Sequence, residues 1–393
     1  MAFAGWHNSR SWGGEYTPLL SAAMSKSEDI DQNPLRHCVM GLNFSKFRAN
    51  SLDYPSHQPN PRPNAEAHAT MPRTFLIDTD TGSDDAVAII MALRAPDVRV
   101  AAITVVAGNV PLPQALSNAL YTAELCGSDV PVFAGASHPL KRALCCADWF
   151  HGQDGLGDHG YVPKNKKAEG KHAVDAMVET IRANPGLTIV TLGPLTNVAL
   201  ALQRDPKLAE SIGRCVIMGG NPCCEGNITP AAEFNIYVDP EAARFVFRSG
   251  MPIEMVGWHL CRGSAALNQR EIDALLASKK PLAEFAILSN SVAAESYHTQ
   301  TDEYGICLPD PTAMGIAIDP KLCIDGTEHY VEIETDSELN RGFTLVDKLN
   351  VAHDRRNIDI WGPTIEAQPR KIHVCWTMDV PAWKKFLFSL LTE

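Results

Sequence analysis

The chain has 393 residues, of which 45% are hydrophobic, and it carries a formal net charge of −12 at pH 7. This length suits one large α/β domain or two smaller ones, and the apolar content is ample for a buried core. The negative charge argues against a nucleic-acid or anionic-membrane surface, so small-molecule chemistry is the better expectation.

Eleven cysteines occur without any CxxC pair and without the spacing of a disulfide framework, which indicates free thiols in a reducing compartment. No apolar run reaches the roughly 18 residues of a membrane span. The N-terminus lacks the basic-then-apolar layout of a secretory signal. We therefore predict a cytoplasmic protein.

Residues 1–72 differ from the rest of the chain, because they are rich in Ser, Asn, Pro and His and show no usable periodicity. They are predicted to be a disordered N-terminal extension. The folded domain is predicted to cover residues 73–393.

Strand-like and helix-like segments alternate along this domain. The predicted strands are 75–77, 98–106, 130–133, 187–192, 214–218, 253–256, 330–334, 343–346 and 371–376. The predicted helices are 86–93, 113–126, 173–183, 197–203, 240–248, 269 to about 297, a short one from 312, and 382–391. This alternation predicts an α/β fold: one open, mostly parallel sheet with helices on both faces. Such sheets bind ligands at the carboxyl ends of their strands.

An acidic turn follows the first predicted strand, in the stretch FLIDTDTGSDDAVAII. Its four carboxylates, Asp78, Asp80, Asp84 and Asp85, lie within eight residues. A helix N-terminus favours a negative charge by only about 1 kcal/mol, which cannot hold four like charges together. Oxygen-only ligands favour a hard cation, Ca²⁺ or Mg²⁺. The alternative is a solvated acidic turn that caps the helix.

Four other polar turns directly follow predicted strands. They are AGN at 107–109, GPLTN at 193–197, GGN at 219–221 and GWH at 257–259. Each alone could be an ordinary turn. Because the carboxyl ends of parallel strands share one edge, their joint placement predicts a binding site there.

The motif DTDTGSDD resembles the N-terminal signature of the calcium-dependent nucleoside hydrolases, the inosine-uridine preferring nucleoside N-ribohydrolase family. The resemblance extends along 73–393 through HGQDGLG, GPLTN, MGG, GN…EFN, PDP and RGFTLVD. The piece DTDT also resembles the nucleophile motif of haloacid-dehalogenase-type phosphatases. That family needs a downstream Lys and a second acidic pair in a GDxxxD-like context, which we do not find.

The resemblance implies roles for residues at the matching positions. The Ca²⁺ ligands would be Asp80, Asp85, the main-chain carbonyl of Thr196, and Asp310. Asp80 would also be the general base, and Asp78 would support the loop. Residues around the sugar would be Asp84, Asn109, Met218, Asn227, Glu233 and Asn235. For Glu233 and Asn235 the alternative is that they cap a loop. His151 could either line the pocket or stabilise its own Gly-rich loop.

These residue types suit the cleavage of an N-ribosidic bond, which passes through an oxocarbenium-like sugar and uses water as nucleophile. A cation lowers the pKa of that water, and a neighbouring carboxylate takes its proton. Amides and carboxylates suit a polyhydroxylated sugar, because they offer donors and acceptors. The implied reaction releases a free base and ribose from a ribonucleoside, as in nucleoside catabolism.

The motifs do not identify the residue that protonates the departing base. Some relatives have His directly before the last calcium-binding Asp, where this chain has Pro309. We take His298 as the leading candidate; the other possible donors are Tyr297, Tyr304 and His259. Trp258 and Tyr297 could stack on a base. Purine or pyrimidine preference stays open.

Pro309 also motivates an alternative from another class, a non-catalytic relative that binds nucleosides or metal. By analogy with the family, we expect a homodimer or homotetramer.

Overall fold

The structure of this protein is a computed structural model, and it describes residues 72–393. The extension predicted for residues 1–72 lies outside the described residues, apart from Pro72. Within the described part, no helix is both long and apolar enough to cross a membrane. The ten cysteines of this part are all free thiols, as predicted.

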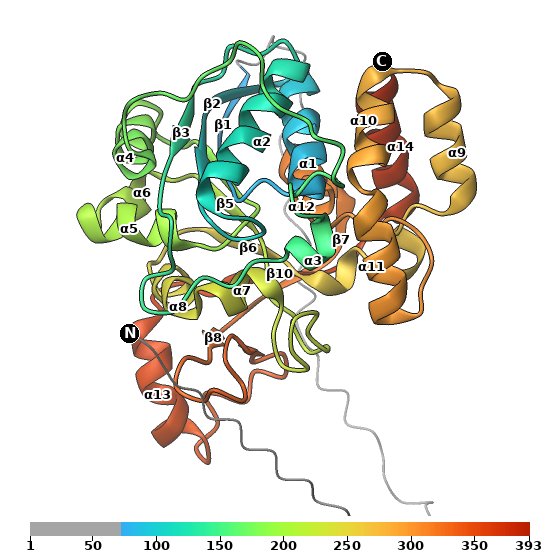
Figure 1. Cartoon of the computed structure of the whole chain (residues 1–393). Helices are drawn as coiled ribbons and strands as arrows, with labels where there is room; N and C mark the ends of the chain where they lie inside the picture. The colour runs from blue at the N-terminus through green and yellow to red at the C-terminus, as the bar shows by residue number, and fades with distance from the viewer. Residues whose placement is uncertain (1–71) are drawn as a thin grey trace, which may run out of the picture. The chain divides into compact units, whose positions relative to one another are not determined.

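An eight-stranded sheet forms the centre of the domain (Figure 1). Its strand order is β3-β2-β1-β4-β5-β6-β10-β7, and every neighbouring pair is parallel except β10 and β7. The strands are β1 (Arg73–Thr79), β2 (Val98–Val105), β3 (Val132–Ala134), β4 (Thr188–Thr191), β5 (Arg214–Met218), β6 (Ile253–Val256), β7 (Cys323–His329) and β10 (Ile372–Met378). The predicted open, mostly parallel sheet is therefore confirmed.

Two predicted strands form a separate small sheet. β8 (Val331–Ile333) and β9 (Thr344–Val346) pair with each other in antiparallel fashion and do not join the central sheet. The antiparallel edge strand β7 was not predicted from the sequence. Its residues CIDGTEH contain acidic residues and Gly, which are rare in strands, and they are mostly exposed. Pairing with β10 holds this segment in the sheet.

Helices cover both faces of the sheet (Figure 1). The α-helices are α1 (Ser83–Arg94), α2 (Leu112–Leu125), α3 (Asp148–His151), α4 (Ala173–Ala183), α5 (Thr196–Arg204), α6 (Leu208–Ser211), α7 (Phe234–Val238), α8 (Pro240–Phe247), α9 (Gln269–Ala277), α10 (Pro281–Ser289), α11 (Ser291–Thr301), α12 (Pro309–Ile318), α13 (Ile358–Ala367) and α14 (Val380–Thr392). The short 3-10 turns are η1 (Trp258–Leu260), η2 (Gly263–Ala265) and η3 (Pro320–Leu322).

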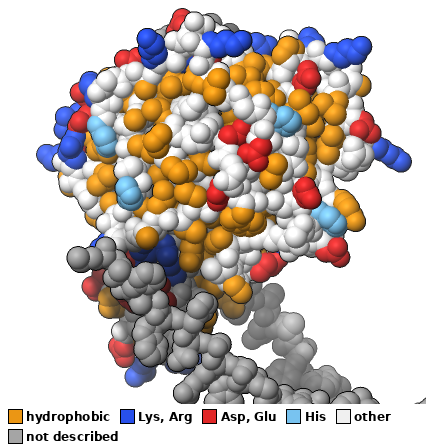
Figure 2. Space-filling view, viewed as in Figure 1, with side chains coloured by type: hydrophobic (Ala, Val, Ile, Leu, Met, Phe, Trp, Pro, Cys, Tyr) orange, Lys and Arg blue, Asp and Glu red, His pale blue; other side chains and the backbone are white. Residues whose placement is uncertain are grey.

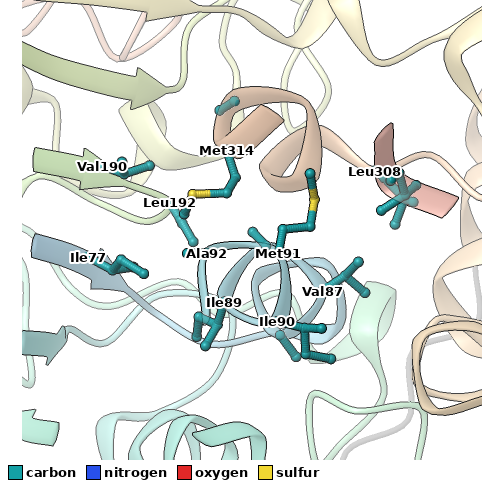
Figure 3. Close-up of a cluster of buried hydrophobic side chains, with 14 of the residues drawn as sticks. Ile77, Val87, Ile89, Ile90, Met91, Ala92, Val190, Leu192, Leu308 and Met314 are labelled. Carbon is teal, nitrogen blue, oxygen red and sulfur yellow. The ribbon is translucent and has the colours of Figure 1, made fainter. Parts of the chain in front are cut away.

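The two faces carry separate apolar cores, because side chains of a strand alternate between faces. In β1, Phe75 and Ile77 belong to the core under α1, α2, α12 and α14, whereas Leu76 belongs to the core under α4, α5 and α8. α1 is buried from Ser83 to Ala92, since the domain packs around it on all sides. Figure 3 shows Met91 of α1 beside Met314 of α12, both in the first of these cores.

The long helical run predicted over 269–297 is three helices. α9 starts with a capping box at Asn268, and Lys279 has a positive φ of 53° just before Pro281 opens α10. Asn290 then separates α10 from α11. Periodicity alone missed these breaks, although Pro281 is a known start signal.

The helix expected from Thr312 begins at Pro309 instead. Proline is favoured at the first helical position because its missing N–H is not needed there. This earlier start places Asp310 in the first turn of α12, which decides the position of its carboxylate.

Candidate active site

One cavity lies beyond the carboxyl ends of the parallel strands. Its wall includes Asn109 after β2, Leu192 after β4, Met218 at the end of β5 and Trp258 after β6. Helix N-termini add Asp84 from α1 and Asp310 from α12. Of the four predicted polar turns, AGN and GWH therefore contribute to the wall, whereas the residues directly before GPLTN and GGN do so in place of those turns.

Three buried carboxylates meet at this cavity. Oxygen atoms of Asp84, Asp85 and Asp310 lie within 4.8 Å of one another. The first two belong to the first turn of α1, and the backbone N–H of Asp310 donates to Asp84 Oδ2 at 3.3 Å, although these residues are 226 positions apart. Packing of α1 on α12 directs the positive ends of two helices at the same cluster.

Asp80 lies behind the cavity wall and is fully buried. Its Oδ2 accepts the Asn109 backbone N–H at 2.6 Å, while its Oδ1 has no hydrogen-bond partner among the described residues. Glycines form its immediate surroundings, because a Cβ at Gly108 or Gly193 would lie 2.0 or 2.4 Å from its carboxylate oxygens. The Asn109 side chain also donates to Asp85 Oδ2 at 3.0 Å, so one residue links Asp80 to the acidic cluster.

Burial and mutual repulsion both act on the four carboxylates of Asp80, Asp84, Asp85 and Asp310. Burial raises the pKa of all four groups, and it brings that of Asp84 to about 6. Neighbouring carboxylates raise the pKa of Asp80, Asp85 and Asp310 further. A cation would reverse both effects. Four carboxylates and an unpartnered buried oxygen therefore fit a hard divalent ion.

Thr196, whose main-chain carbonyl was expected as a ligand, is not among the residues that line the cavity. It opens α5, it is buried, and its hydroxyl donates to Asp239 Oδ2 at 2.7 Å. Leu192 lines the cavity instead, and its carbonyl accepts from Asn235 Nδ2 at 2.8 Å. The turn between Leu192 and Thr196 carries the chain away from the cavity. Leu192 could have been found from its place in the sequence, since it is the first residue after β4 and ligands bind at the carboxyl ends of strands.

All seven residues expected around the sugar line the cavity. They are Asp84, Asn109, His151, Met218, Asn227, Glu233 and Asn235. Their contacts with a substrate stay predictions. Asn235 Nδ2 also donates to Met218 O at 3.2 Å, so these two residues support each other.

Glu233 has a structural role in addition to its place on the wall. Its Oε1 accepts the Asn235 N–H at 2.9 Å, and its Oε2 accepts those of Gly220 at 2.9 Å and Ile236 at 3.2 Å. The carboxylate thus caps α7 and holds the turn after β5. The loop-capping alternative for Glu233 is therefore observed, and it does not exclude contact with a sugar.

Glu233→Gln is expected to destabilise the protein by about 1–3 kcal/mol, because the new amide would face backbone N–H groups and leave buried donors unpaired. We also expect weaker activity through displacement of Asn235. Urea unfolding monitored by circular dichroism would measure the first effect. Glu179→Gln, an exposed change on α4, is the control. An unchanged unfolding free energy for Glu233→Gln would contradict the capping role.

His151 is held at the cavity by a short contact with α1. Its Nδ1 lies 2.8 Å from Ser83 Oγ and 3.8 Å from Asp84 Oδ1. Burial lowers the pKa of His151 to about 4, so the imidazole is neutral at pH 7. Of the two roles considered, the structure supports a place in the pocket.

The structure does not bring His298 to the cavity, and this corrects its expected position as the acid. Its ring stacks on Tyr304 with centroids 3.9 Å apart. Ala293 and Gln300 of the same helix line the cavity. His298 is two residues from Gln300, so about 200° of rotation separates it from the lining face.

The other proposed donors are also engaged elsewhere. The Tyr297 hydroxyl donates to Glu303, and the half-buried His259 lies against Trp376 rather than at the wall. Tyr304 is 79% exposed. None of these residues is part of the cavity wall. Trp258, expected to stack on a base, does line the cavity.

Sequence reasoning missed an aromatic part of the wall. Trp149 and Phe150 of α3, together with Phe234, line the cavity near Trp258. Phe150 packs against the small apolar clusters of both Trp258 and Phe234. The signal was available, because Trp149 and Phe150 immediately precede the HGQDGLG motif.

Comparison with known proteins agrees with this site. The family model of the inosine-uridine preferring nucleoside hydrolases matches residues 75–385. The pyrimidine-specific ribonucleoside hydrolase RihB of Escherichia coli is 36% identical over 298 residues, which are 75% of this chain and 93% of the relative.

Two solved structures are similar over almost their full length. A plant nucleoside hydrolase, the PpNRh1 enzyme, aligns with a TM-score of 0.75 and 34% identity over 82% of this chain and 99% of its own. A purine-preferring ribonucleoside hydrolase from Gardnerella vaginalis aligns with a TM-score of 0.71 and 29% identity over 81% of this chain and 98% of its own. This chain therefore belongs to the inosine-uridine preferring nucleoside hydrolase family.

Proposed function

We propose that this nucleoside hydrolase cleaves the N-glycosidic bond of ribonucleosides to free base and ribose, with Ca²⁺ as cofactor and Asp80 as general base. The observation that supports Asp80 most directly is its carboxylate. One oxygen is held by Asn109, and the other is buried beside the cluster of Asp84, Asp85 and Asp310, without a partner among residues 72–393.

The residues that would hold Ca²⁺ are Asp80, Asp85, Asp310 and the main-chain carbonyl of Leu192, which replaces Thr196 in this proposal. When bound, Ca²⁺ supplies a Lewis acid that lowers the pKa of a water molecule and orients sugar hydroxyls. All of these donors are oxygens, as Ca²⁺ prefers.

The chain's own groups carry the remaining steps. Asp80 accepts the proton of the attacking water, since a carboxylate beside the bound water can serve as its general base. Asp84, Asn109 and Asn235 hydrogen bond to sugar hydroxyls. The buried carboxylates stabilise the positive charge that develops on the sugar in the transition state.

The base is expected to bind among the aromatic residues Trp149, Phe150 and Trp258. Stacking on such rings is favourable for every nucleobase, so these contacts alone do not select one. Pro309 lines the cavity where some relatives have His, and the neutral His151 is the imidazole on the wall. No side chain is assigned as a charged acid for the leaving base.

Stabilisation of the protein by Ca²⁺ is expected to grow as the pH rises from 5 to 8. Burial raises the pKa of Asp84 to about 6 and also raises those of Asp85 and Asp310. In the metal-free protein these groups keep protons that the unfolded chain has released above about pH 4. Their contribution to stability therefore falls as pH rises through this window, and Ca²⁺ must displace fewer protons at higher pH.

The measurement is the melting temperature with Ca²⁺ and with a chelator, at several pH values. At 100 times its Kd, Ca²⁺ adds about 2.7 kcal/mol, or about 4 °C for a domain of this size. Taking the difference at each pH removes the effect of all other titrating groups. A Ca²⁺-induced shift that is the same at pH 5 and pH 8 would contradict this prediction.

The activity is tested by incubating the full chain with inosine, adenosine, uridine and cytidine, and following the free base by chromatography with and without a calcium chelator. Both purines and pyrimidines are needed, because one relative is named pyrimidine-specific and one structure purine-preferring. We expect calcium-dependent release from at least one of them. No release from folded, metal-loaded protein would favour the non-catalytic alternative.

Homodimer or homotetramer assembly and a cytoplasmic location stay predictions. A surface for nucleic acid is not expected. Lys and Arg side chains lie at separate places around the edge of the face shown in Figure 2, not in one patch. Analytical ultracentrifugation would determine the assembly state.

A further inference from the structure

A second group of metal-binding side chains lies outside the cavity. It consists of Glu254 in β6, His373 in β10 and Cys323 in β7. Glu254 and His373 are each the second residue of a parallel strand, near the amino ends, whereas the cavity lies at the carboxyl ends. None of the three lines that cavity, so the reaction proposed above does not use them.

The sheet brings the three side chains together. His373 is paired with Glu254 across β10 and β6, and residues paired in a sheet point to the same face. One sulfur, one imidazole nitrogen and one carboxylate oxygen of the group lie within 4.8 Å of one another. All three come from strands of the central sheet, which hold ligands more rigidly than loops do.

Gly326 in β7 shows that the sulfur and the nitrogen converge on one point. A Cβ at this position would lie 2.4 Å from His373 Nε2 and 3.0 Å from Cys323 Sγ. Both atoms therefore face the space that the glycine leaves open. A larger residue would push the imidazole and the thiol apart.

A second thiol adjoins the group. Cys375 lies two residues after His373 on the same face of β10. It is paired across β10 and β7 with Gly326, the glycine beside which Cys323 Sγ lies. Metals bind the thiolate form of cysteine, so this second thiol would complete the ligand set.

Acidic and basic side chains both surround the group. Glu254 and Glu328 lie close enough to act on His373, and Arg214, Arg370 and Lys371 line the same surface pocket. Arg214 donates to Glu254 Oε2 at 2.9 and 2.5 Å. The same guanidinium donates to the carbonyls of Ala317 and Ile316, so it is anchored and orients the carboxylate while the other oxygen is left for a metal ion.

We propose that Cys323, His373 and Glu254, completed by Cys375, bind a zinc-class divalent ion that ties the edge strand β7 to β10 and β6. Sulfur and imidazole donors select Zn²⁺ over Ca²⁺, whereas the all-oxygen cluster of the cavity has the opposite preference. Sites with four protein ligands are structural, so this ion would stabilise the sheet edge and leave catalysis to the cavity.

Cobalt provides the test, because Co²⁺ bound by thiolate gives a near-ultraviolet charge-transfer band that oxygen ligands do not give. The full, reduced chain is titrated with Co²⁺ in excess Ca²⁺, which occupies the cavity cluster. We expect about one equivalent to produce the band and Zn²⁺ to displace it. Cys323→Ser and His373→Gln should each weaken binding by roughly tenfold or more. Cys145→Ser, a half-buried cysteine outside the group, should bind as the wild type does.

The result is independent of hydrolase activity, because the readout is spectroscopic. Circular dichroism establishes whether each variant is folded. If Cys323→Ser does not fold, Cys375→Ser provides a second variant that lacks one sulfur. A reduced wild-type chain without the band would overturn the proposal, as would a band that persists in both cysteine variants. Isolation of the chain with a Cys323–Cys375 disulfide, seen by mass spectrometry without reductant, would also overturn it.

Discussion

Asp80→Asn is expected to lower kcat for base release by about 10²- to 10⁴-fold, the usual contribution of a general base. The amide cannot accept the proton of water, and it is also a weaker metal ligand. The fold should persist, because the remaining carbonyl oxygen can still accept the Asn109 N–H that now bonds to Asp80 Oδ2 at 2.6 Å. Both glycines around Asp80 leave room for an isosteric side chain.

Steady-state release of base from the fastest substrate of the panel measures this effect. Asp129→Asn, at an exposed position, provides the matched control and should retain full activity. Circular dichroism and melting temperature show whether Asp80→Asn is folded. A folded variant with ordinary turnover and ordinary Ca²⁺ affinity would mean that another group is the base.

Asp310→Asn is expected to raise the Kd for Ca²⁺ by roughly 10- to 100-fold, since ligand charge sets affinity at oxygen sites. Activity at limiting Ca²⁺ should fall accordingly. The effect on the metal-free protein has the opposite sign. Burial and the charges of Asp84 and Asp85 raise the pKa of Asp310, so a neutral amide removes a buried repulsion and should leave the chelated variant no less stable than the chelated wild type.

Melting temperatures with Ca²⁺ and with chelator separate these two effects in one experiment. The wild type should gain stability from Ca²⁺, and Asp310→Asn should gain little at the same concentration. Asp129→Asn should behave as the wild type does. If Asp310→Asn keeps the full Ca²⁺-induced shift, Asp310 is not a ligand, and the assignment of Asp80 as base is then tested separately by its own variant.

Much of the fold could be read from the sequence, because its signals are local. α4, β5 and β6 have the predicted bounds, and the apolar run after the acidic turn is the buried helix α1. Strand β7 escaped detection, because polar residues and Gly hide its pattern and only the neighbour β10 makes it a strand. α13 escaped for a similar reason, since Pro363 interrupts a helix that buries no residue.

In the candidate site, too, residues in one short motif could be predicted, whereas residues placed by packing could not. Asp80, Asp84 and Asp85 were identifiable because they lie in one short turn whose charge pattern calls for a cation. The main-chain carbonyls of Leu192 and Thr196 could not be distinguished in this way, since the path of the turn between them decides which one lies at the cavity. For His298, its position around helix α11 decided that it faces Tyr304 and not the cavity.

The sequence by itself determined most of the strands and helices, the acidic turn and the family, because periodicity, caps and motifs are properties of neighbouring residues. The resemblance already placed Asp310 with Asp80 and Asp85, but only the tertiary structure shows the contact of its backbone N–H with Asp84, which precedes it by more than two hundred positions. The tertiary structure also decided that Glu254, Cys323 and His373 form a second group. The reason is physical: convergence of distant side chains depends on how α1 packs on α12 and how β6, β10 and β7 pair, and no local pattern encodes those contacts.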